Sequence, residues 1–501
     1  MNRLSFLARA SLLVGSFFLL DKALAFVRLS IISRLYSGSV ELLDTFNAAN
    51  NLPDVLFALI SGGALAMAFI PLMTEYLTRK DRLAAWDLFS RVANLAFLVT
   101  AASAVIVAIF AEQIVRAEIG IAPGFGAQQR GLVAELMRLN LVGTIIFSIS
   151  GLVMASLQAN QHFLLPALAP TMYNIGQIIG ALYLTPRYGL HGLVYGVILG
   201  AAMHLVIQIP GLIKYRFRWT PSLDLRNTGL LEALRLLGPR LLTMGGIQAI
   251  VLARDNLASR LGQVGAVTSL TYGWMIMQVP ETILATAVAT AMLPTLAEFA
   301  ARREWSRFRE TVEKALRVLI ALSIPIAAVM AAGLQPLVRA VFGFDEATST
   351  LLTWTTRAYL LTLTGFAIQE VAARAFYARK EPLFPLIAVI LRLAIFLGLG
   401  ITAVIWFRQI GAPILAFAEI ALLIESVVLL TWLRQQLHET IRVEAAVVRG
   451  LMAAVVGGVL AYVLAVALPG SAIQTALIGM VAGGLIAVVI VRNEVALLLH
   501  L

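Results

Sequence analysis

The chain has 501 residues, of which 60% are hydrophobic and 13% charged, and its mean hydropathy is +0.90. Soluble domains carry about 25% charged residues, so this composition excludes a soluble globular protein and predicts one that uses lipid as its solvent. The formal net charge is +11, but the basic residues lie in short loops rather than on one surface, which argues against a nucleic-acid partner. The absence of cysteine excludes disulfides and thiolate metal sites, and the five histidines show no zinc-ligand spacing.

The N-terminal segment has some features of a cleavable signal peptide. A basic start leads into an apolar run to Leu20, followed by Ala23-Leu-Ala25. However, Asp21 and Lys22 would lie just before the cut, and apolar sequence continues through Leu35. We therefore interpret this segment as the first membrane helix.

A helix needs about 20 apolar residues, rising 1.5 Å each, to cross a bilayer. This rule predicts an all-α polytopic membrane protein with about fourteen transmembrane helices, near 7–36, 46–76, 84–111, 132–157, 162–183, 189–211, 229–256, 264–297, 310–337, 348–377, 383–406, 411–433, 446–468 and 472–494. Eighteen Lys and Arg residues lie in the N-terminus and after the even-numbered spans, against six in the opposite loops. This imbalance predicts that both termini are cytoplasmic.

The chain contains an internal repeat. Pro71-Leu-Met-Thr-Glu75 returns as Pro294-Thr-Leu-Ala-Glu298, at an offset of 223 residues. A second pair, 159–166 and 378–385, has an offset of 219. The repeat spans six helices, an even number, so both halves insert with the same orientation and are related by a pseudo-two-fold axis along the membrane normal. The predicted domains are two six-helix lobes, 1–228 and 229–440, with two extra helices in 441–501.

Charged side chains within predicted spans cost roughly 2.5–3.5 kcal/mol each, so each needs a function or a partner. On the first helix, Asp21 and Arg28 are about 10 Å apart along the axis, too far for a direct pair. Arg28 therefore binds either an anionic phosphate ligand or a carboxylate of a neighbouring helix. Lys22 is a second candidate cation, and Arg34 is predicted to be interfacial.

Later spans carry further charged candidates. The two predicted lobes should leave a cavity between them, where a transported ligand would bind. Arg254 and Asp255 point in different directions on a helix, so each faces either this cavity or another helix. Glu370 and Arg374 are four residues apart and predict a same-face ion pair. Glu419 and Glu425 have two alternatives: they pair with Arg392, or they bind a coupling cation.

Prolines and glycines mark candidate hinges. Pro53 and Pro280 each precede an acidic residue at corresponding places in the repeat, and Gly62 and Gly63 follow Pro53 by about two turns. Such residues permit bending or close helix packing. No nucleophile–base pairing and no phosphate-binding loop is recognisable, and the longest loop, about 112–131, is too short for a catalytic domain. The sequence therefore indicates a transporter rather than an enzyme, without a cofactor.

The chain resembles the MurJ/MviN family of lipid II flippases, in the superfamily that includes the multidrug and toxin extrusion (MATE) antiporters. The resemblance runs through most of the chain in family order. It is carried by Lys22-Ala-Leu-Ala-Phe-Val-Arg28, Asp44-Thr-Phe46, Leu52-Pro53, Gly63-Ala64, Ala68-Phe-Ile-Pro71, Glu75-Tyr76, Pro166-Ala-Leu-Ala-Pro170-Thr-Met-Tyr-Asn174, Gly238-Pro239, Leu257-Ala-Ser259, Tyr272, Pro280, Leu293-Pro294 and Phe376-Tyr377-Ala378-Arg379.

The resemblance implies a flippase of the bacterial cytoplasmic membrane. Its implied substrate is the undecaprenyl-pyrophosphate-linked peptidoglycan precursor, moved by alternating access. Lys22 and Arg28, with Arg254, are the implied cations for the pyrophosphate, and Asp44 matches an acid at the outer end of the first helix. The two extra helices would form a groove for the lipid tail. Membrane lipids and cell-wall synthesis enzymes are the other implied partners, and the coupling cation is undefined.

The chain departs from the family pattern in its cavity charges. Phe57 and Ala58 stand near the family's Arg-Arg pair, Gly62 replaces a Glu, and Met275 replaces an Arg. Lysine at position 22 also lacks the bidentate phosphate geometry of arginine. Three alternatives follow: export of another lipid-linked oligosaccharide, MATE-like cation-coupled export of small molecules, or a non-transporting scaffold.

Overall fold

A computed structural model describes residues 6–62, 64–79, 81–223, 228–437 and 441–497. The regular secondary structure of these residues is helical, without a strand, which confirms the predicted all-α class. The chain separates into two compact units, unit 1 with residues 1–256 and unit 2 with residues 257–501.

Unit 1 contains the first half of the sequence repeat. Its helical elements are α1 (Phe6–Leu35), α2 (Val40–Leu56), η1 (Phe57–Gly62), α3 (Ala64–Arg79), α4 (Arg82–Ile109), α5 (Ala111–Arg116), α6 (Ala127–Ala159), α7 (Leu164–Ile179), η2 (Gly180–Leu184), α8 (Thr185–Tyr188), α9 (Leu190–Val206), α10 (Ile209–Lys214) and most of α11 (Thr228–Ser259).

Unit 2 contains the part of the second half that follows α11, and the two extra spans. Its elements are α12 (Ala266–Glu281), η3 (Thr282–Thr286), α13 (Ala287–Arg302), α14 (Trp305–Phe342), α15 (Glu346–Leu360), α16 (Leu363–Ala378), α17 (Leu383–Trp406), η4 (Arg408–Ile410), α18 (Ala412–Ala418), α19 (Ala421–Leu437), α20 (Glu444–Ala467), α21 (Ala472–Ile490) and α22 (Arg492–Leu497).

Eight helical segments in the described part of the chain are long and apolar enough to cross a membrane. They are Arg82–Ile109, Ala127–Ala159, Leu190–Lys214, Trp305–Phe342, Leu383–Trp406, Ala412–Leu437, Glu444–Ala467 and Ala472–Ile490. The predicted count of fourteen stays a prediction. Among the other predicted spans, those near 46–76 and 264–297 are each interrupted by the π-helical segments η1 and η3.

These interruptions are short π-helical segments that follow a proline. Pro53 lies near the end of α2, just before η1, and Pro280 lies at the end of α12, just before η3. Proline lacks the N–H that an α-helix needs and clashes with the preceding turn, so the regular ladder is disturbed near it. Because the two sites correspond in the repeat, the sequence repeat has a structural counterpart.

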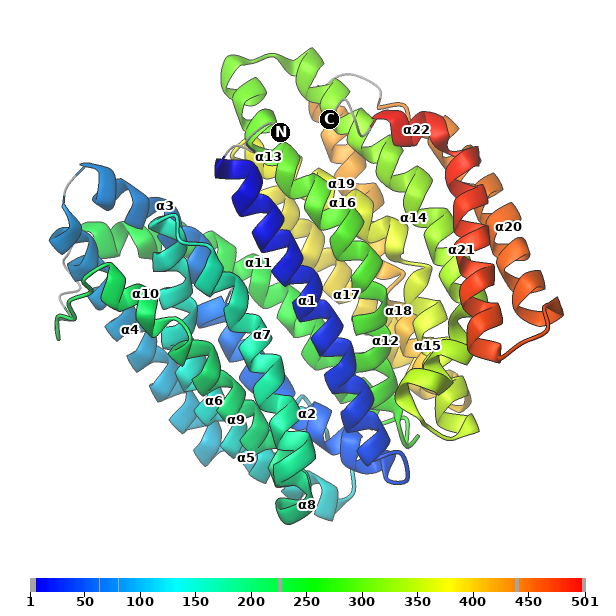
Figure 1. The fold of residues 1–501 in the computed structure, drawn as a ribbon, viewed down its shortest axis with the longest axis horizontal. Coiled ribbons are helices and arrows are strands. Elements are labelled where there is room, and N and C mark those ends of the chain that lie inside the picture. The colour runs from blue at the N-terminus through cyan, green and yellow to red at the C-terminus, as the bar shows by residue number, and fades with distance from the viewer. Residues whose placement is uncertain (1–5, 63, 80, 224–227, 438–440, 498–501) are drawn as a thin grey trace. The chain divides into compact units, whose positions relative to one another are not determined.

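The helices α6, α7 and α9 pack against one another in unit 1, and they lie side by side in Figure 1. Glycines bring the backbones of α7 and α9 together. A Cβ on Gly176 would lie 2.3 Å from the Cα of Gly200, and a Cβ on Gly180 would lie 2.3 Å from the Cα of Gly196. Such small residues at four-residue spacing allow membrane helices to pack through their backbones.

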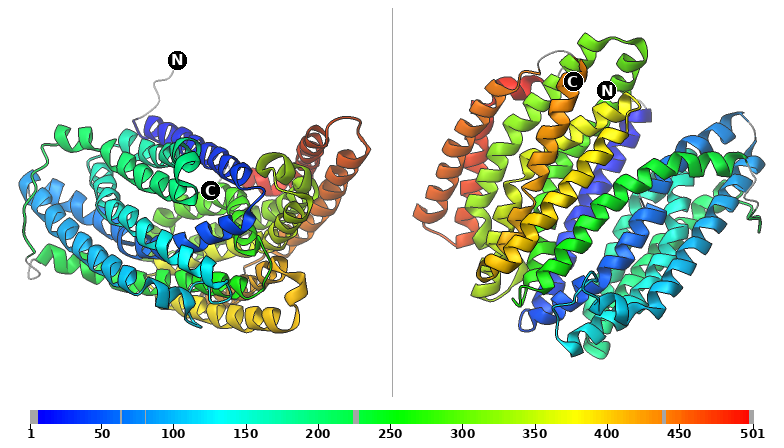
Figure 2. Two further views of the ribbon diagram at one scale, coloured as in Figure 1. Left: turned by 90° about the horizontal axis from the view of Figure 1, so that it is seen from below. Right: turned by 180° about the vertical axis from the view of Figure 1, so that it is seen from behind.

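In unit 2, α14 is the central helix, and the hairpin of α20 and α21 packs against it (Figures 1 and 2). The predicted extra spans therefore belong to this unit. The two helices of the hairpin also meet through glycine, since a Cβ on Gly483 would lie 2.3 Å from the carbonyl oxygen of Gly457. The adjacent Gly484 has no atom within 4 Å of its Cβ position.

We expect Gly483→Ala to lower the stability of the hairpin and Gly484→Ala to leave it unchanged or slightly higher. The first substitution overpacks a backbone contact, at a cost of about 1–3 kcal/mol, whereas the second adds helix propensity in open space. Thermal melting of the two variants in the same detergent makes the comparison. Equal melting temperatures would contradict the close approach of α20 and α21.

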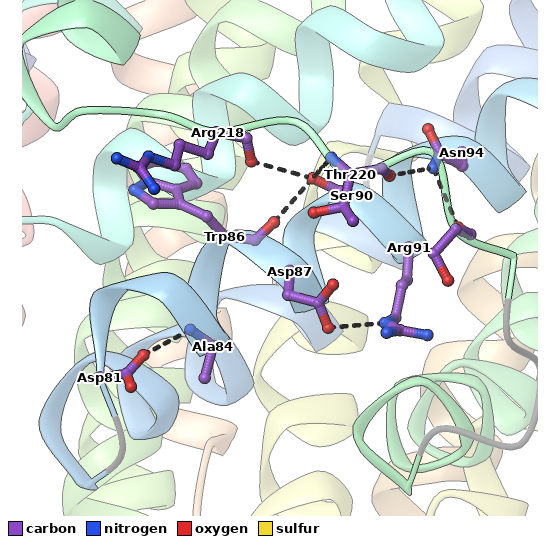
Figure 3. A network of polar contacts seen from close by, with 10 residues as sticks. Asp81, Ala84, Trp86, Asp87, Ser90, Arg91, Asn94, Arg218 and Thr220 are labelled. Carbon is purple, nitrogen blue, oxygen red and sulfur yellow. Dashed lines mark hydrogen bonds and ion pairs between the residues drawn. The ribbon is translucent and has the colours of Figure 1, made fainter.

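The segment between the sixth and seventh predicted spans, residues 215–222, is bound along α4. Figure 3 shows Ser90 and Asn94 of α4 bonded to this segment. Trp86 Nε1 donates to the carbonyl of residue 215 at 3.1 Å. Ser90 Oγ accepts from the amide of Thr220 at 3.1 Å, and Asn94 donates to the Thr220 carbonyl at 2.9 Å. The backbone of this linker segment is thereby held against unit 1.

Ser90→Ala is expected to release the Thr220 amide. The lost hydrogen bond is worth about 1 kcal/mol, so hydrogen exchange at this amide should accelerate about fivefold. Exchange measured by mass spectrometry on the peptide that includes 215–222 tests this. The control is Ser37→Ala, because the Ser37 hydroxyl lies in the turn after α1 and donates to the carbonyl of Arg34, far from the linker segment in the sequence. Unchanged exchange in the Ser90 variant would show that this bond is not made.

Helix α15 begins with an aspartate cap that lies outside the predicted spans. The amide of Thr348 donates to Asp345 Oδ1 at 3.0 Å, and bonds from Thr348 hold the pKa of that carboxyl below its usual range. An aspartate whose pKa is lower in the folded protein than in the unfolded chain stabilises the fold. This stabilisation is complete above the pKa of the unfolded chain, about 3.9, and is lost as the pH falls through the pKa of the folded protein. Asp345→Ala should therefore cost about 1 kcal/mol at pH 7. The difference in melting temperature should shrink below about pH 4.

Candidate functional site

Unit 1 encloses a cavity of about 300 Å³. It lies among α2 with η1, α6, α7 and α9. Its lining residues are Asn50, Pro53, Asp54, Phe57, Asn140, Gly143, Thr144, Phe147, Met154, Pro170, Tyr173, Val197 and His204. This volume is at the lower end of the range of ligand pockets, so the cavity can hold a headgroup fragment rather than a large glycopeptide.

Aromatic rings form one wall of the cavity. Phe147 lies at the centre, with ring centroids 5.0 Å from Phe57, 4.9 Å from Tyr173 and 5.2 Å from His204. The three partners come from η1, α7 and α9, so the Phe147 side chain of α6 joins all the elements around the cavity. Phe57, which stands near the position of the Arg-Arg pair in the resembled family, therefore contributes packing here.

The polar lining joins α2 to α6. Asn140 donates to Asn50 Oδ1 at 2.6 Å, and Thr144 Oγ1 donates to the carbonyl of Pro53 at 3.3 Å. The second bond occupies a carbonyl close to the helix irregularity that Pro53 introduces. The predicted hinge residue Pro53 therefore lies in the cavity wall.

Arg28 of α1 lies close to this cavity without lining it. It interacts electrostatically with Asp54 and with Tyr173, two of the lining residues. Its side chain is half-buried, and its Nε has no hydrogen-bond partner. None of the described lining residues is a Lys or Arg. The positive charge of Arg28 is therefore linked to the cavity by its electrostatic interaction with the lining residue Asp54.

The other predicted cation of α1, Lys22, is half-buried and interacts electrostatically with Asp21. Asp21 also accepts a hydrogen bond from Asn174 of α7, at 2.7 Å. This bond fixes α1 to α7. It also gives Asp21 a partner other than Arg28, as the helical spacing predicts.

Arg254 is buried, with 5% of its surface exposed, and pairs with its sequence neighbour Asp255 at 2.7 Å. Asp255 in turn accepts a hydrogen bond from Asn51 of α2. From their different directions on the helix, the two residues were expected to have separate partners. The structure instead pairs them with each other. The guanidinium reaches it because the long arginine side chain can fold back along the helix, although the Cβ directions differ.

The remaining predicted gating residues are distributed over both units. Asp44 of α2 is buried, and Gly62 is the last residue of η1. Gly63 lies outside the described residues. Pro280 is buried in unit 2 at the end of α12. The structure thus brings Arg28 and Pro53 together around one cavity in unit 1, with Arg254 linked to α2 through Asp255 and Asn51.

Unit 2 holds a buried charge network. Arg392 of α17 contacts Glu419 at 2.8 Å and Glu425 at 3.5 Å, and all three side chains are almost fully buried. This confirms the first of the two predicted alternatives, pairing with Arg392. A coupling cation stays a prediction. The predicted pair of Glu370 and Arg374 is also present, at 2.8 Å.

The sequence patterns do not single out three polar cavity residues. Asp54 is the acidic residue that follows Pro53, and an acid within an apolar span is a functional candidate by default. Tyr173 lies within one of the motifs shared with the family. His204, which bonds to Ser150 of α6 at 2.6 Å, lies in a strongly apolar helix and carries the same signal.

Comparison with known families and sequences gives one consistent result. The model of the family described as "Lipid II flippase MurJ" matches residues 35–481. A lipid II flippase MurJ of Burkholderia cenocepacia is 27% identical over 386 residues, which cover 75% of this chain and 74% of that protein. A probable lipid II flippase MurJ of Vibrio cholerae is 25% identical over 392 residues, covering 76% and 74%.

Comparison with solved structures shows the fold. A lipid II flippase MurJ in an inward closed conformation matches with a TM-score of 0.80 and 21% identity, over 96% of this chain and 98% of that one. An inward-facing MATE-family multidrug transporter matches with a TM-score of 0.69 and 15% identity, over 83% and 94%. The chain therefore has the fold that these two groups of transporters share.

Proposed function

We propose, since this chain belongs to the lipid II flippase MurJ family, that it moves lipid II across the bacterial cytoplasmic membrane. The observation that carries the proposal is the family match over residues 35–481, which includes α2, η1 and the cavity elements of unit 1. In this proposal the protein is a transporter and not an enzyme. Its substrate is the undecaprenyl-pyrophosphate-linked precursor, and its mechanism is alternating access.

The proposed pyrophosphate site is built around Arg28. Its unpartnered Nε is a donor that a phosphate oxygen would satisfy, and hydrogen bonds to charged groups are the strong ones. Lys22 lies on the same helix and adds positive charge. Arg254 is the third cation, but a phosphate would have to compete there with Asp255.

The proposed hinges are the two proline-linked π-helical segments. Pro53 with η1 and Pro280 with η3 interrupt equivalent helices of the repeat, and π-helical turns are frequent at functional sites. We assign the bending that alternating access requires to these two places, with Gly62 at the end of η1. The lobes 1–228 and 229–440 would be the moving parts, and the hairpin of 441–501 would hold the lipid tail.

The proposed topology places both termini in the cytoplasm. In that orientation the linker segment lies on the cytoplasmic side, together with the basic loops. Cell-wall synthesis enzymes are proposed as partners, and a coupling cation is proposed without an assigned site. Labelling of single cysteines introduced into the cysteine-free chain tests the orientation, because an impermeant reagent would reach only the outer loops.

A second candidate, cation-coupled export of small molecules, is favoured by one observation. The described lining of the cavity contains the carboxylate Asp54 and no Lys or Arg. An acidic cavity suits an organic cation. Arg28 counts against this candidate, because its positive charge lies next to that carboxylate.

Reconstituted proteoliposomes distinguish the candidates. Labelled lipid II, a second undecaprenyl-linked oligosaccharide and a fluorescent organic cation are supplied separately to the same wild-type preparation. We expect movement of lipid II and not of the cation. If only the second lipid moves, that lipid and not lipid II is the substrate. If only the cation moves, the protein is a cation-coupled exporter. A folded protein that moves none of them would be a scaffold.

A further inference from the structure

We infer that Asp54 is an exchangeable counter-ion of Arg28: a phosphate group that binds Arg28 takes the place of the Asp54 carboxylate, which then takes up a proton. The inference rests on the proposed function for its ligand, an anionic phosphate of a lipid headgroup. It adds a coupled proton and a residue that carries it.

The first observation is that Arg28 and Asp54 are neighbours without being locked together. They interact electrostatically, but no ion pair within 4.0 Å joins Arg28 to a carboxylate among the described residues. Arg28 also keeps a hydrogen-bond donor, Nε, without a partner. A loosely held arginine can exchange one anion for another at a lower cost than one in a tight bidentate pair.

The second observation is that Asp54 opens onto a cavity. Its side chain is exposed and lines the 300 Å³ space, together with the amides of Asn50 and Asn140. Most of the lining is apolar, but Asp54, Asn50 and Asn140 give water molecules the polar partners that they need in a cavity of this size. Water in this cavity gives the Asp54 carboxyl a route for gaining and losing a proton.

The third argument is electrostatic. An ionised Asp54 beside Arg28 repels a phosphate at the same arginine, and two like charges within about 4–6 Å raise the proton affinity of one of them. The low dielectric of a membrane interior strengthens this repulsion. Protonation of Asp54 removes it. By linkage, a proton on Asp54 then raises the affinity for phosphate as much as phosphate raises the affinity for the proton.

Other titratable or charged groups face the same region, and each already has a described partner. On α1, Asp21 accepts from Asn174 and interacts with Lys22. On α9, His204 is bonded to Ser150. The α11 pair Arg254–Asp255 is closed on itself and on Asn51, and the α7 phenol Tyr173 packs on Phe147. Asp54 is the acid here for which the described residues provide no hydrogen bond.

The test measures binding of two probes to the full-length protein in nanodiscs, inorganic pyrophosphate and undecaprenyl pyrophosphate, between pH 5.5 and 8. For the wild type, affinity should rise toward low pH by up to about tenfold per pH unit, the limit for one linked proton. Asp54→Asn should bind the probes tightly at every pH. The only pH dependence left in this variant should come from the titration of the probe itself. Asp54→Glu should restore the wild-type slope.

Calorimetry in buffers of different ionisation enthalpy counts the protons directly. The wild type should take up more protons per bound probe than Asp54→Asn, by up to about one. Asp87→Asn, which removes a charge from the α4 pair with Arg91, is the matched control and should behave as the wild type. His204→Gln should also keep the pH slope, because the inference assigns the proton to Asp54.

Three outcomes would overturn the inference. Equal pH slopes in the wild type and Asp54→Asn would remove Asp54 as the proton carrier, and loss of the slope only in His204→Gln would assign the proton to the histidine. Both leave the proposed function in place. Failure of the folded wild type to bind either probe would overturn the proposed function and the inference together. Binding of both probes would show that the pyrophosphate group is sufficient for binding. Binding of undecaprenyl pyrophosphate alone would show that the lipid tail is also required.

Discussion

Arg28→Ala is expected to abolish measurable flipping of lipid II while the protein remains folded. Arg28 is the cation next to the cavity, and its Nε lacks a partner within the protein. A hydrogen bond to a charged group is worth about 1.5–3 kcal/mol. Its loss should weaken pyrophosphate binding about ten- to hundredfold. Flipping of labelled lipid II in proteoliposomes and binding in nanodiscs measure the two effects.

Two further variants make the Arg28 result specific. Arg28→Lys keeps the charge but loses the fork of donors that fits a phosphate, so it should retain partial activity. Arg34→Ala removes an exposed arginine from the end of the same helix and should flip lipid II like the wild type. Full activity in Arg28→Ala would take Arg28 out of the mechanism, although lipid II would remain the substrate.

Arg392→Met is expected to destabilise unit 2 by about 3–5 kcal/mol. The substitution leaves Glu419 and Glu425 buried without the cation that both contact. A buried charge that has lost its partner is costly because neither water nor protein compensates it. Thermal unfolding in detergent should show a large fall in melting temperature, or the variant should fail to accumulate in the membrane.

The matched control for Arg392 is an exposed ion pair. Arg302 and Glu298 lie 2.7 Å apart, but both are more than half exposed, so Arg302→Met should cost less than about 1 kcal/mol. A triple variant that also replaces Glu419 and Glu425 by glutamine should recover much of the lost stability, since no buried charge remains. Similar losses for Arg392→Met and Arg302→Met would contradict the buried network.

Local sequence patterns predicted those features that depend on helical periodicity. The four-residue spacing of Glu370 and Arg374 indicated their ion pair, and the repeated proline-acid steps indicated the places where the two interrupted helices deviate. In each case the relevant neighbours lie within one or two turns. The geometry of a helix therefore fixes the contact before tertiary packing is known.

Features that depend on which helices meet were beyond the sequence. Asp54 became a candidate only when α2, α6, α7 and α9 were seen to enclose one cavity. The linker segment was also invisible, because Ser90 and Asn94 bind backbone groups, which every sequence possesses. Arg254 illustrates a third limit: its choice of Asp255 depends on side-chain length rather than on the direction of the Cβ.

The π-helical segment η1 has a consequence for how the cavity wall can move. A π-helical turn contains an additional residue compared with an α-helical turn. One residue corresponds to about 100° of rotation and 1.5 Å of rise in an α-helix. If the position of the π-helical turn shifts along the helix, the side chains that it passes turn by about that angle. The two ends of the helix stay attached to the same loops. In η1 such a shift would turn Phe57 out of the cavity wall and bring its neighbour Ala58 in, exchanging a large side chain for a small one.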